Sequence, residues 1–342
     1  MSHEITKTDN VVMHSQPAWH GLGIVVEDAP TPREALTIGG IDWGVQNRPV
    51  YTKDDDGNEI EVEGTRANYR ADTGELLGVV GSKFPVVQNV DLADFCSALL
   101  EEDKKETVRC ETVGSIRGGK QIWFLLKGSP FAIHNGDELF PYLLVSNGHD
   151  GTHPIRVTPT TIRTVCSNTL HMVIPHYDTG ELGDSAIVIR HTANAMERLQ
   201  EARNALKHYK VTLEDNRSLA EFLAKKELDK KALTEYFLEN YSTDFGAIPN
   251  NPKTKVEQNR KDRAESAFAS FTRRFDDERS IAGTSYWNAI NAYSGLMQHD
   301  RKTRGQTDEE RVLNRVESNL FGLSQYRTQE ALKRAFALAL KS

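Results

Sequence analysis

The sequence predicts an α+β protein, in which a mixed or antiparallel β-sheet region with a packed helix precedes an all-α half. Up to about residue 190, short apolar runs are separated by turn residues such as Gly, Asn and Asp, as in strands joined by hairpins. Beyond that point apolar residues recur every three or four positions, which is typical of amphipathic helices. We therefore predict an α+β domain over 1–190 and an α-helical region over 191–342.

The strands of the first half are predicted from apolar runs bounded by turn signals such as "DDDGN" and "ADTGE". They cover residues 43–52, 59–70, 76–84, 106–117, 120–128, 138–147, 153–160 and 185–191. A helix is expected over 90–103, where Asn89 or Asp91 can cap its first turn. The run at 120–128 is apolar almost throughout, which predicts a central strand buried on both faces.

The helices of the second half follow from stripes of apolar residues at helical spacing. They are predicted at 192–211, 218–226, 229–240, 255–277, 284–299, 308–321 and 325–341. The segment 241–255 holds Gly, two Pro and many polar residues, so a loop is expected there. Gly322 is expected to end the penultimate helix, and Ser324 is expected to cap the last one.

The composition, 38% hydrophobic and 27% charged, is that of a soluble globular protein. No apolar run is long enough to span a membrane, and the polar N-terminus lacks the apolar segment of a secretory signal. Three cysteines without a CxxC pattern favour a reducing compartment, so we expect the cytoplasm, including that of an infected host cell. A net charge of −7 argues against coating of duplex nucleic acid, although a local basic groove is compatible with it.

Common catalytic and cofactor motifs do not occur in the sequence. The segment "GSIRGGK" (114–120) has the wrong spacing for a phosphate-binding loop, and neither GxSxG nor SxxK is present. Gly21 and Gly23 alone are too little for a dinucleotide fingerprint. We therefore expect no cofactor and favour a function without catalysis.

Several segments together resemble one known family. They are "GLGIVV", "FPVVQNVDLADF", "VSNGHDGTHPIRVTPTTIRTVCSNTL", "GTSYWNAINAYSGLMQHD" and "ESNLFG", in this order along nearly the whole chain. The chain is thereby identified as a member of the DUF932 family of phage- and plasmid-borne proteins, with Gly148 standing where a small polar residue is expected. The resemblance implies a cytoplasmic protein of a mobile element, and its name assigns no chemistry. A more distant resemblance to Rad52-like annealing proteins rests on the β-β-β-α order of 45–103.

Histidines are concentrated between residues 149 and 208. They are His149, His153, His171, His176, His191 and His208. With Asp150 they could form a metal site, but their spacing is irregular, and the alternative that "GHDG" closes a hairpin is favoured. Cys166 could act as a nucleophile if a neighbouring base lowered the pKa of its thiol, and a buried structural thiol is the favoured alternative.

Polar and basic residues on the predicted strands suggest a surface that holds phosphate groups. The candidate nucleic-acid-binding residues are Lys83, Arg117, Lys120, Asn147, Arg156, Arg163 and Asn168, with Arg109 and several threonines beside them. The aromatic residues that could stack on unpaired bases are Phe84, Trp123, Phe131 and Tyr142. Trp123 and Tyr142 lie in runs that also read as core, and the arginines could instead pair with nearby acidic residues.

The helical half has its own basic tract, with eight Lys or Arg against six Asp or Glu over 253–279, and "DRKTRG" (300–305) adds three more. Such mixed charges usually form a solvated helix face. A subunit interface is the second interpretation, because large apolar residues such as Phe268 and Trp287 accompany them.

The leading functional hypothesis is a single-stranded nucleic-acid-binding protein that acts without catalysis, with annealing or recombination as its narrower form and a homo-oligomer as its state. Arg156 and Arg163 would contact the phosphates. One alternative is a counter-defence factor that binds a host protein, since the acidic net charge suits protein partners. The other is a metal- or Cys-dependent enzyme that uses His149, Asp150, His153 or Cys166.

Overall fold

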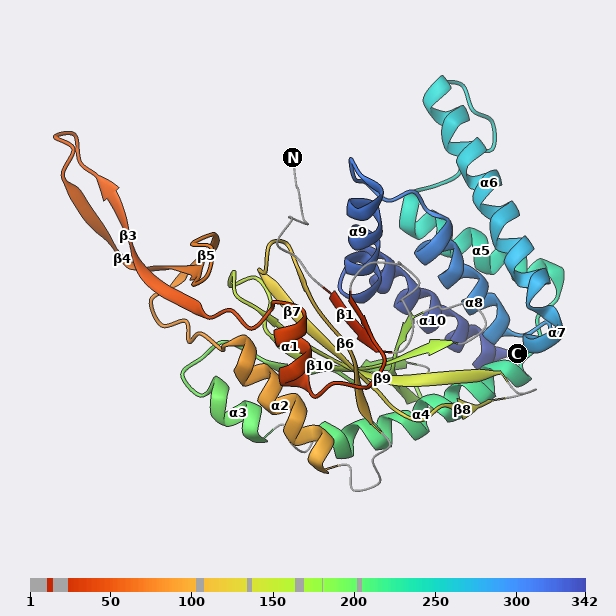
Figure 1. Cartoon of the computed structure of the whole chain (residues 1–342). Helices are drawn as coiled ribbons and strands as arrows, with labels where there is room; N and C mark the ends of the chain where they lie inside the picture. The colour runs from red at the N-terminus through yellow and green to blue at the C-terminus, as the bar shows by residue number, and fades with distance from the viewer. Residues whose placement is uncertain are drawn as a thin grey trace.

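The computed structural model describes residues 11–14, 24–102, 108–133, 137–163, 169–179, 181–201 and 205–342. Within them the chain has the expected α+β organisation, with sheets in the first half and helices in the second (Figure 1). The hydrophobic core joins the two halves. One cluster of buried residues, for example, contains both Leu139 of the first half and Phe336 of the second. The division into domains at residue 190 stays a prediction.

A large mixed sheet forms the centre of the molecule, and among the described residues it has nine strands. These are β1 (Val11–His14), β2 (Ile24–Val26), β6 (Arg109–Ile116), β7 (Gln121–Lys127), β8 (Phe131–Ala132), β9 (Glu138–Gly148), β10 (Ile155–Arg163), β11 (Thr169–His171) and β14 (Ile187–Ile189). The main order is β11-β10-β9-β7-β6-β1-β2, while β14 pairs with β10 and β8 pairs with β9. Only the pairing of β1 with β2 is parallel among these described pairs.

Two smaller sheets accompany it. One consists of β3 (Val45–Lys53), β4 (Glu59–Arg70) and β5 (Leu76–Gly81), and the other of β12 (Val173–His176) and β13 (Glu181–Asp184). The β3–β4 hairpin projects from the body as a two-stranded arm (Figure 1). Its turn is closed by Asp54, whose carboxylate accepts hydrogen bonds from the backbone amides of Asp56 and Asn58 at 3.0 and 2.7 Å.

Strand β7 is central and buried on both faces, as its apolar run predicts. Ile122, Phe124 and Leu126 face the cluster that contains α1 (Pro32–Ile38), α2 (Asn89–Glu102) and the start of α4 (Ala205–Lys225). Trp123 and Leu125 face the opposite cluster, which includes Val316 and Leu320 of α9 (Asp308–Leu320). Successive side chains of β7 point to opposite faces of the sheet, so helices pack on both faces.

The helices in the described segments are α1 (Pro32–Ile38), α2 (Asn89–Glu102), α3 (Ala195–Glu201), α4 (Ala205–Lys225), α5 (Lys230–Phe245), α6 (Lys255–Asp277), α7 (Arg279–Ala282), α8 (Tyr286–Gly295), the π-helical turn η3 (Leu296–Asp300), α9 (Asp308–Leu320) and α10 (Leu323–Lys341). The order β3-β4-β5-α2 is the predicted one, but α2 packs chiefly on α1 and also contacts α4 and strands β7 and β9 of the large sheet. All residues of α8 are buried, because α4, α6 and α10 surround it.

Several helix boundaries differ from the prediction. The helix expected at 218–226 is the end of one long helix, α4, because its apolar stripe continues from the preceding turns. Helix α5 extends to Phe245, five residues into the expected loop. Ser324 does not cap α10, which begins at Leu323; the hydroxyl of Ser324 donates instead to the carbonyl of Met297 at 3.2 Å. Strands β1 and β2 and helix α1 were not predicted.

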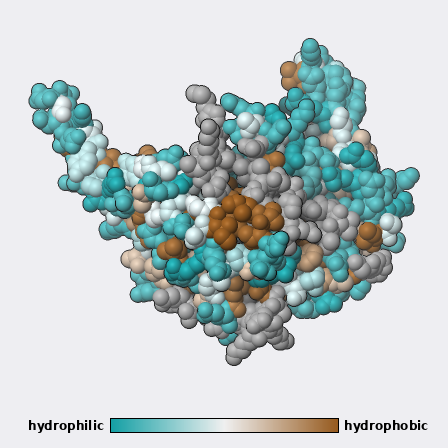
Figure 2. Space-filling model, in the orientation of Figure 1, coloured by the Kyte–Doolittle hydropathy of each residue, from teal (hydrophilic) through white to brown (hydrophobic). Residues whose placement is uncertain are grey.

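No helix in the described part of the chain combines the length and the apolarity that crossing a bilayer requires. Figure 2 shows a mostly hydrophilic surface with a prominent apolar patch over β1 and β2. In β2, an edge strand of the large sheet, Ile24 and Val25 are about half exposed.

Candidate nucleic-acid interface

The candidate residues proposed from sequence have different surroundings in the structure. Asn147 is buried, and its amide donates to the carbonyl of Val87 at 3.1 Å. Arg117, in the β6–β7 turn, forms an ion pair with Glu317 of α9. Lys83 is exposed after β5, and Lys120 is partly exposed at the end of the β6–β7 turn. Whether Lys83 and Lys120 touch nucleic acid stays a prediction.

Arg156 is exposed on β10 and opens on a cavity of about 520 Å³ between the sheet and the α9–α10 junction. His153, His171 and Tyr326 also line this cavity. Burial lowers the pKa of His171 to about 4, so its ring is neutral near pH 7. The side chain of Arg163 and all of Asn168 lie outside the described residues, as does Cys166.

The aromatic residues proposed for base stacking are largely occupied by the protein itself. Trp123 and Tyr142 are 1% and 7% exposed, so they belong to the core, which is the alternative their apolar runs suggested. Phe84 stacks on His191 with 4.3 Å between ring centroids. Phe131 packs against the core of the helical half.

The "GHDG" segment forms the hairpin turn between β9 and β10, with Gly151 at φ 81°. His149 is fully buried there, and its Nε2 lies 2.8 Å from Oδ1 of Asn89. Burial, followed by the nearby His191, lowers the pKa of His149 to about 3. The Asp150 carboxylate accepts from the backbone and hydroxyl of Thr152, at 2.9 and 2.8 Å. These contacts describe a turn held by its own side chains.

The described histidines, cysteines and acidic residues contain no group of three or more that could hold a metal ion. Cys96 and Cys110 are free thiols in the core. Burial raises the pKa of Cys110 to about 12 and that of Cys96 well above its usual value, so both thiols are protonated and unreactive at neutral pH.

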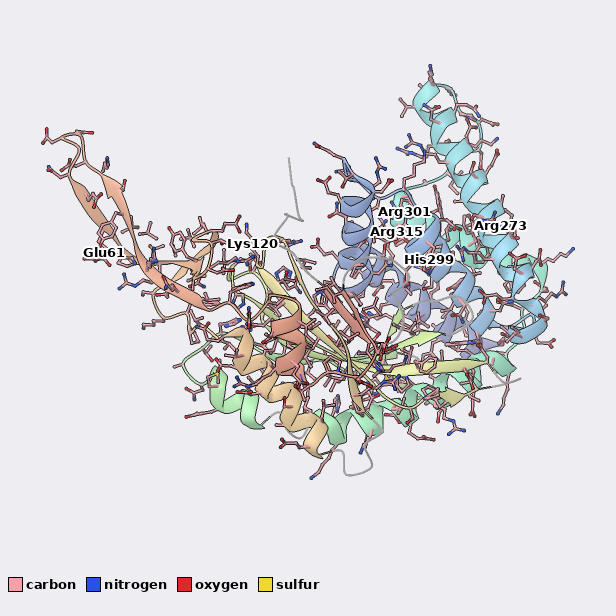
Figure 3. All side chains as sticks on the ribbon, in the orientation of Figure 1. Glu61, Lys120, Arg273, His299, Arg301 and Arg315 are labelled. Carbon is pink, nitrogen blue, oxygen red and sulfur yellow. The ribbon has the colours of Figure 1, made fainter. Side chains whose placement is uncertain are left out.

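A basic groove lies elsewhere, between helices α6 and α9. Two hollows of about 840 and 1150 Å³ meet at Met297, Arg301 and Lys302, on and just after η3. We call this surface the α6–α9 groove. Its charged residues are six basic and three acidic ones: Asp262, Arg263, Arg273, Asp300, Arg301, Lys302, Arg304, Glu310 and Arg315. The whole chain carries a net charge of −7, whereas basic residues are in excess in the groove. Figure 3 labels three of them, Arg273, Arg301 and Arg315.

The two walls of the groove are α6 and α9, and capping residues in the sequence define where each helix begins. Thr254 and Glu257 form a capping box at the start of α6, and Thr307 caps α9 by accepting from the amide of Glu310 at 3.1 Å. The η3–α9 loop is held by α9: Asn314 donates to the carbonyl of Arg304 at 2.8 Å, and Arg315 donates to that of Arg301 at 3.2 Å. The loop that carries three basic residues is therefore anchored to one wall.

The floor of the groove brings two guanidinium groups onto one aromatic ring. Arg301 and Arg327 lie 4.5 and 4.3 Å from the centre of the Phe245 ring. Asp244 is bound to Arg327 at 3.5 Å and accepts a hydrogen bond from the Tyr293 hydroxyl at 2.6 Å. Partial burial and then the charge of Arg327 lower the pKa of Arg301. Asp244 is therefore already bound to Arg327 and Tyr293, and Arg301 adds a second positive charge close to it.

On the α6 side of the groove, Asp300 and Arg274 form an ion pair. Arg274 holds Asp300 by two hydrogen bonds of 2.7 and 2.5 Å, and Ser270 donates a third. Burial alone would raise the pKa of Asp300, but these hydrogen bonds outweigh it and keep that pKa below its usual value. Asp300 is therefore ionised and committed to Arg274, which fixes the end of η3 against α6.

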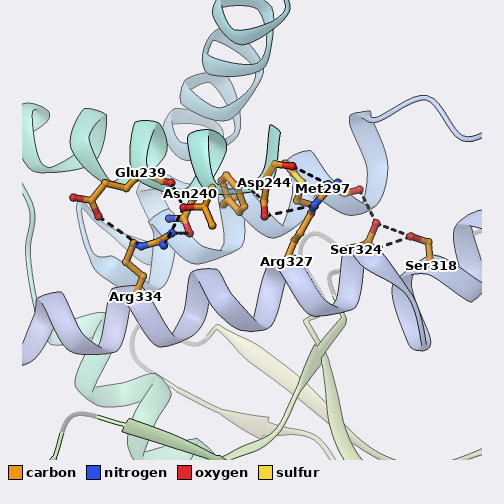
Figure 4. A network of polar contacts seen from close by, with 10 residues as sticks. Glu239, Asn240, Asp244, Met297, Ser318, Ser324, Arg327 and Arg334 are labelled. Carbon is orange, nitrogen blue, oxygen red and sulfur yellow. Dashed lines mark hydrogen bonds and ion pairs between the residues drawn. The ribbon is translucent and has the colours of Figure 1, made fainter. Parts of the chain in front are cut away.

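A polar network beneath the groove joins α5, α9, α10 and η3 (Figure 4). Arg334 of α10 contacts Asn240 and lies 3.6 Å from Glu239. At the other end, the Ser318 and Ser324 hydroxyls are 3.0 Å apart, at the α9–α10 junction. These contacts tie α5, α9, α10 and η3 to one another beneath the groove.

The sequence contained the signal for this groove but not its location. The basic tracts at 253–279 and 300–305 were interpreted as a solvated face or a subunit interface. The two tracts are far apart in the sequence. In the structure α8 and η3 run back along α6, so the second tract lies beside the middle of α6. Phe245 and Tyr241, which line the same hollow, sit on α5 and carried no functional signal at all.

The comparisons with known proteins agree with the resemblance found in the sequence. The chain matches no curated protein and no solved structure. The model of the family described as "Domain of unknown function (DUF932)" matches residues 76–318, a span that includes most of the large sheet and the helices of the groove. Because that span is more than half of the chain, the protein belongs to the DUF932 family.

Proposed function

We propose that the protein binds single-stranded nucleic acid in the α6–α9 groove, without catalysing a reaction. The observation that carries the proposal is the set of six Lys and Arg side chains on two joined hollows of a protein whose net charge is −7. Phosphate neutralisation by such clusters supplies most of the sequence-independent affinity for nucleic acid. What counts is the local distribution of charge, not the total.

The apolar part of the groove favours an unpaired strand over a duplex. Phe245 is half-buried and lines one hollow with the basic residues, whereas Tyr241 and Met297, 8% and 3% exposed, belong to the core beneath it. Unstacked bases can lie on aromatic and arginine planes, which the bases of a duplex cannot reach because they are already stacked. Arg301 on Phe245 combines a phosphate-binding charge with such a plane.

Annealing of complementary strands is the narrower form of this proposal, and the resemblance to phage- and plasmid-borne proteins supplies a setting for it. A protein that holds one strand with its bases accessible can present it to a second strand. Mixing complementary labelled oligonucleotides with and without the protein measures this step directly.

Fluorescence anisotropy with a labelled oligothymidine, titrated between 50 and 200 mM salt, tests the proposal. We define the groove variant as Arg263→Gln, Lys302→Gln and Arg304→Gln, three exposed residues of the groove. With a slope of about −0.7 per phosphate contact, the triple change should reduce the salt slope by about 2 and the affinity about tenfold or more. The control is Lys207→Gln, Lys225→Gln and Lys341→Gln, which are exposed outside the groove and have the same charge change.

A second pair of changes, Lys83→Gln with Arg156→Gln, tests the surface proposed from sequence. Loss of binding in this pair but not in the groove variant would move the site to the sheet. No shift of the oligonucleotide at low salt, or equal losses in the groove variant and its control, would contradict the proposed function.

A further inference from the structure

The β3–β4 hairpin is an acidic arm. Its outer part, residues 51–66, contains six acidic residues and two basic ones. Asp54 is used by the turn, and Glu61 forms an ion pair with Arg66 at 2.8 Å. The remaining four, Asp55, Asp56, Glu59 and Glu63, are exposed.

The arm also exposes large apolar side chains, which is unusual for so charged a ribbon. Tyr51 and Ile60 are 53% and 49% exposed. Tyr51 pairs with Glu61 and Ile60 with Thr52, so the two side chains lie on opposite faces of the ribbon. Figure 2 shows the arm as a mostly hydrophilic projection that stands away from the body. A free two-stranded ribbon is only marginally stable in water, so a partner surface would stabilise it.

The α6–α9 groove has the complementary chemistry. It carries the excess of basic residues described above, and Val256, which is 70% exposed, lies with Phe245 and Arg263 on an adjoining hollow of about 430 Å³. Glu61 of the arm and Arg273, Arg301 and Arg315 of the groove lie at opposite ends of the molecule (Figure 3). The arm of one copy therefore points away from its own groove.

We infer that the acidic arm of one copy docks in the α6–α9 groove of a second copy. The contact pairs the carboxylates of Asp55, Asp56, Glu59 and Glu63 with the basic groove residues, and Tyr51 or Ile60 with its apolar floor. Because the two surfaces differ, the contact is heterologous, and repetition makes a ring or an open chain of subunits. This inference does not depend on nucleic acid, although both occupants use the same groove.

Two variants separate the two surfaces. The arm variant is Asp55→Asn, Asp56→Asn, Glu59→Gln and Glu63→Gln, and it leaves Asp54 and the turn intact. The groove variant is the one defined above. A charge-matched control for the arm variant is Asp28→Asn, Asp178→Asn, Glu27→Gln and Glu197→Gln, all of which are exposed outside the arm.

Sedimentation velocity at low ionic strength should show the average mass of the wild type and of the control rising with concentration. In 1 M salt, where the Debye length is about 3 Å, both should return to the monomer. The arm variant and the groove variant should each remain monomeric alone. Mixed in equal amounts they should form a 1:1 dimer and nothing larger, because one copy can only accept an arm and the other can only supply one.

A monomeric wild type at every concentration would overturn the inference, as would an equimolar mixture that contains monomers only. Loss of assembly in the charge-matched control would also overturn it, because the effect would then follow net charge. Since assembly is measured without nucleic acid, failure of the proposed function leaves this result unaffected. Where both hold, oligothymidine should dissociate the assembly in proportion to its binding.

Discussion

The guanidinium of Arg301 lies over the ring of Phe245, 4.5 Å from its centre, and shares that ring with Arg327. The two residues come from the loop after η3 and the last turn of α5. Two like charges on one ring, with Asp244 as the nearby carboxylate, leave positive charge at the floor of the groove. An anion bound there would relieve the repulsion between the two arginines.

Replacing Arg301 with Gln should weaken the binding of oligothymidine and reduce the salt slope by about 0.7, the value expected for one lost phosphate contact on a single strand. The melting temperature should stay the same or rise, since a partly buried like charge is removed. Arg279→Gln, an exposed arginine on α7 outside the groove, is the control. An unchanged slope would show that Arg301 contacts no phosphate.

Arg117 occupies a left-handed backbone conformation, with φ of 59°, in the β6–β7 turn. The variants Arg117→Gly and Arg117→Ala both lose the ion pair with Glu317, so comparing them isolates the backbone conformation. Alanine keeps the steric cost of a positive φ that arginine also bears, about 1 kcal/mol, whereas glycine does not. Urea unfolding should therefore rank alanine below both the wild type and glycine. Equal stability of the two variants would show that the positive φ at residue 117 carries no steric cost.

The buried histidines should make the protein sensitive to acid. The pKa of His149 falls to about 3 in the fold and is near 6.5 in the unfolded chain, so between these values the unfolded chain binds more protons. Stability is then full above about pH 6.5 and decreases as the pH falls, by up to about 1.4 kcal/mol per pH unit. His171, with a pKa of about 4, acts in the same direction.

Unfolding curves between pH 7 and 4.5 measure this effect. His149→Gln keeps an N–H donor for Asn89 and removes the titrating ring, so its stability should depend less steeply on pH than that of the wild type. His176→Gln, which changes an exposed histidine, serves as the control. The same pH dependence in wild type and His149→Gln would rule out His149 as the source.

Gly114 of β6 faces the indole of Trp123 on β7, and a Cβ at this glycine would lie 2.6 Å from a ring carbon. Gly114→Ala should therefore destabilise the protein by about 1–3 kcal/mol, because the tryptophan is buried and packed on α9 and cannot move freely. Gly81→Ala, where a Cβ meets no atom within 4 Å, should be close to neutral. Calorimetry of both variants makes the comparison, and a neutral Gly114→Ala would mean that the sheet adjusts.

Much of the fold was accessible from the sequence, because its signals are local. The apolar run at 120–128 predicted a strand buried on both faces, and the stripe at 255–277 predicted a helix whose bounds are those of α6. Where the signal required more distant information, the prediction was wrong: Ser324 has the side chain of a cap, but its hydroxyl is drawn to Met297 by the packing of η3. The π-helical turn itself has no sequence signature among the residues that form it.

The sequence by itself determined the α+β class, the β3-β4-β5-α2 order, the family and the presence of two basic tracts. The class, this order and the tracts depend on residue type and on spacing within a few turns of the chain. The tertiary structure alone decided that Asn147 is buried, that Arg117 meets Glu317, and that Arg263 and Arg304 line one groove while an acidic arm projects at the opposite end. The sequence shows the sign of each charge. The effect of a charge depends on which other charges lie within a few ångströms, and only folding sets those distances.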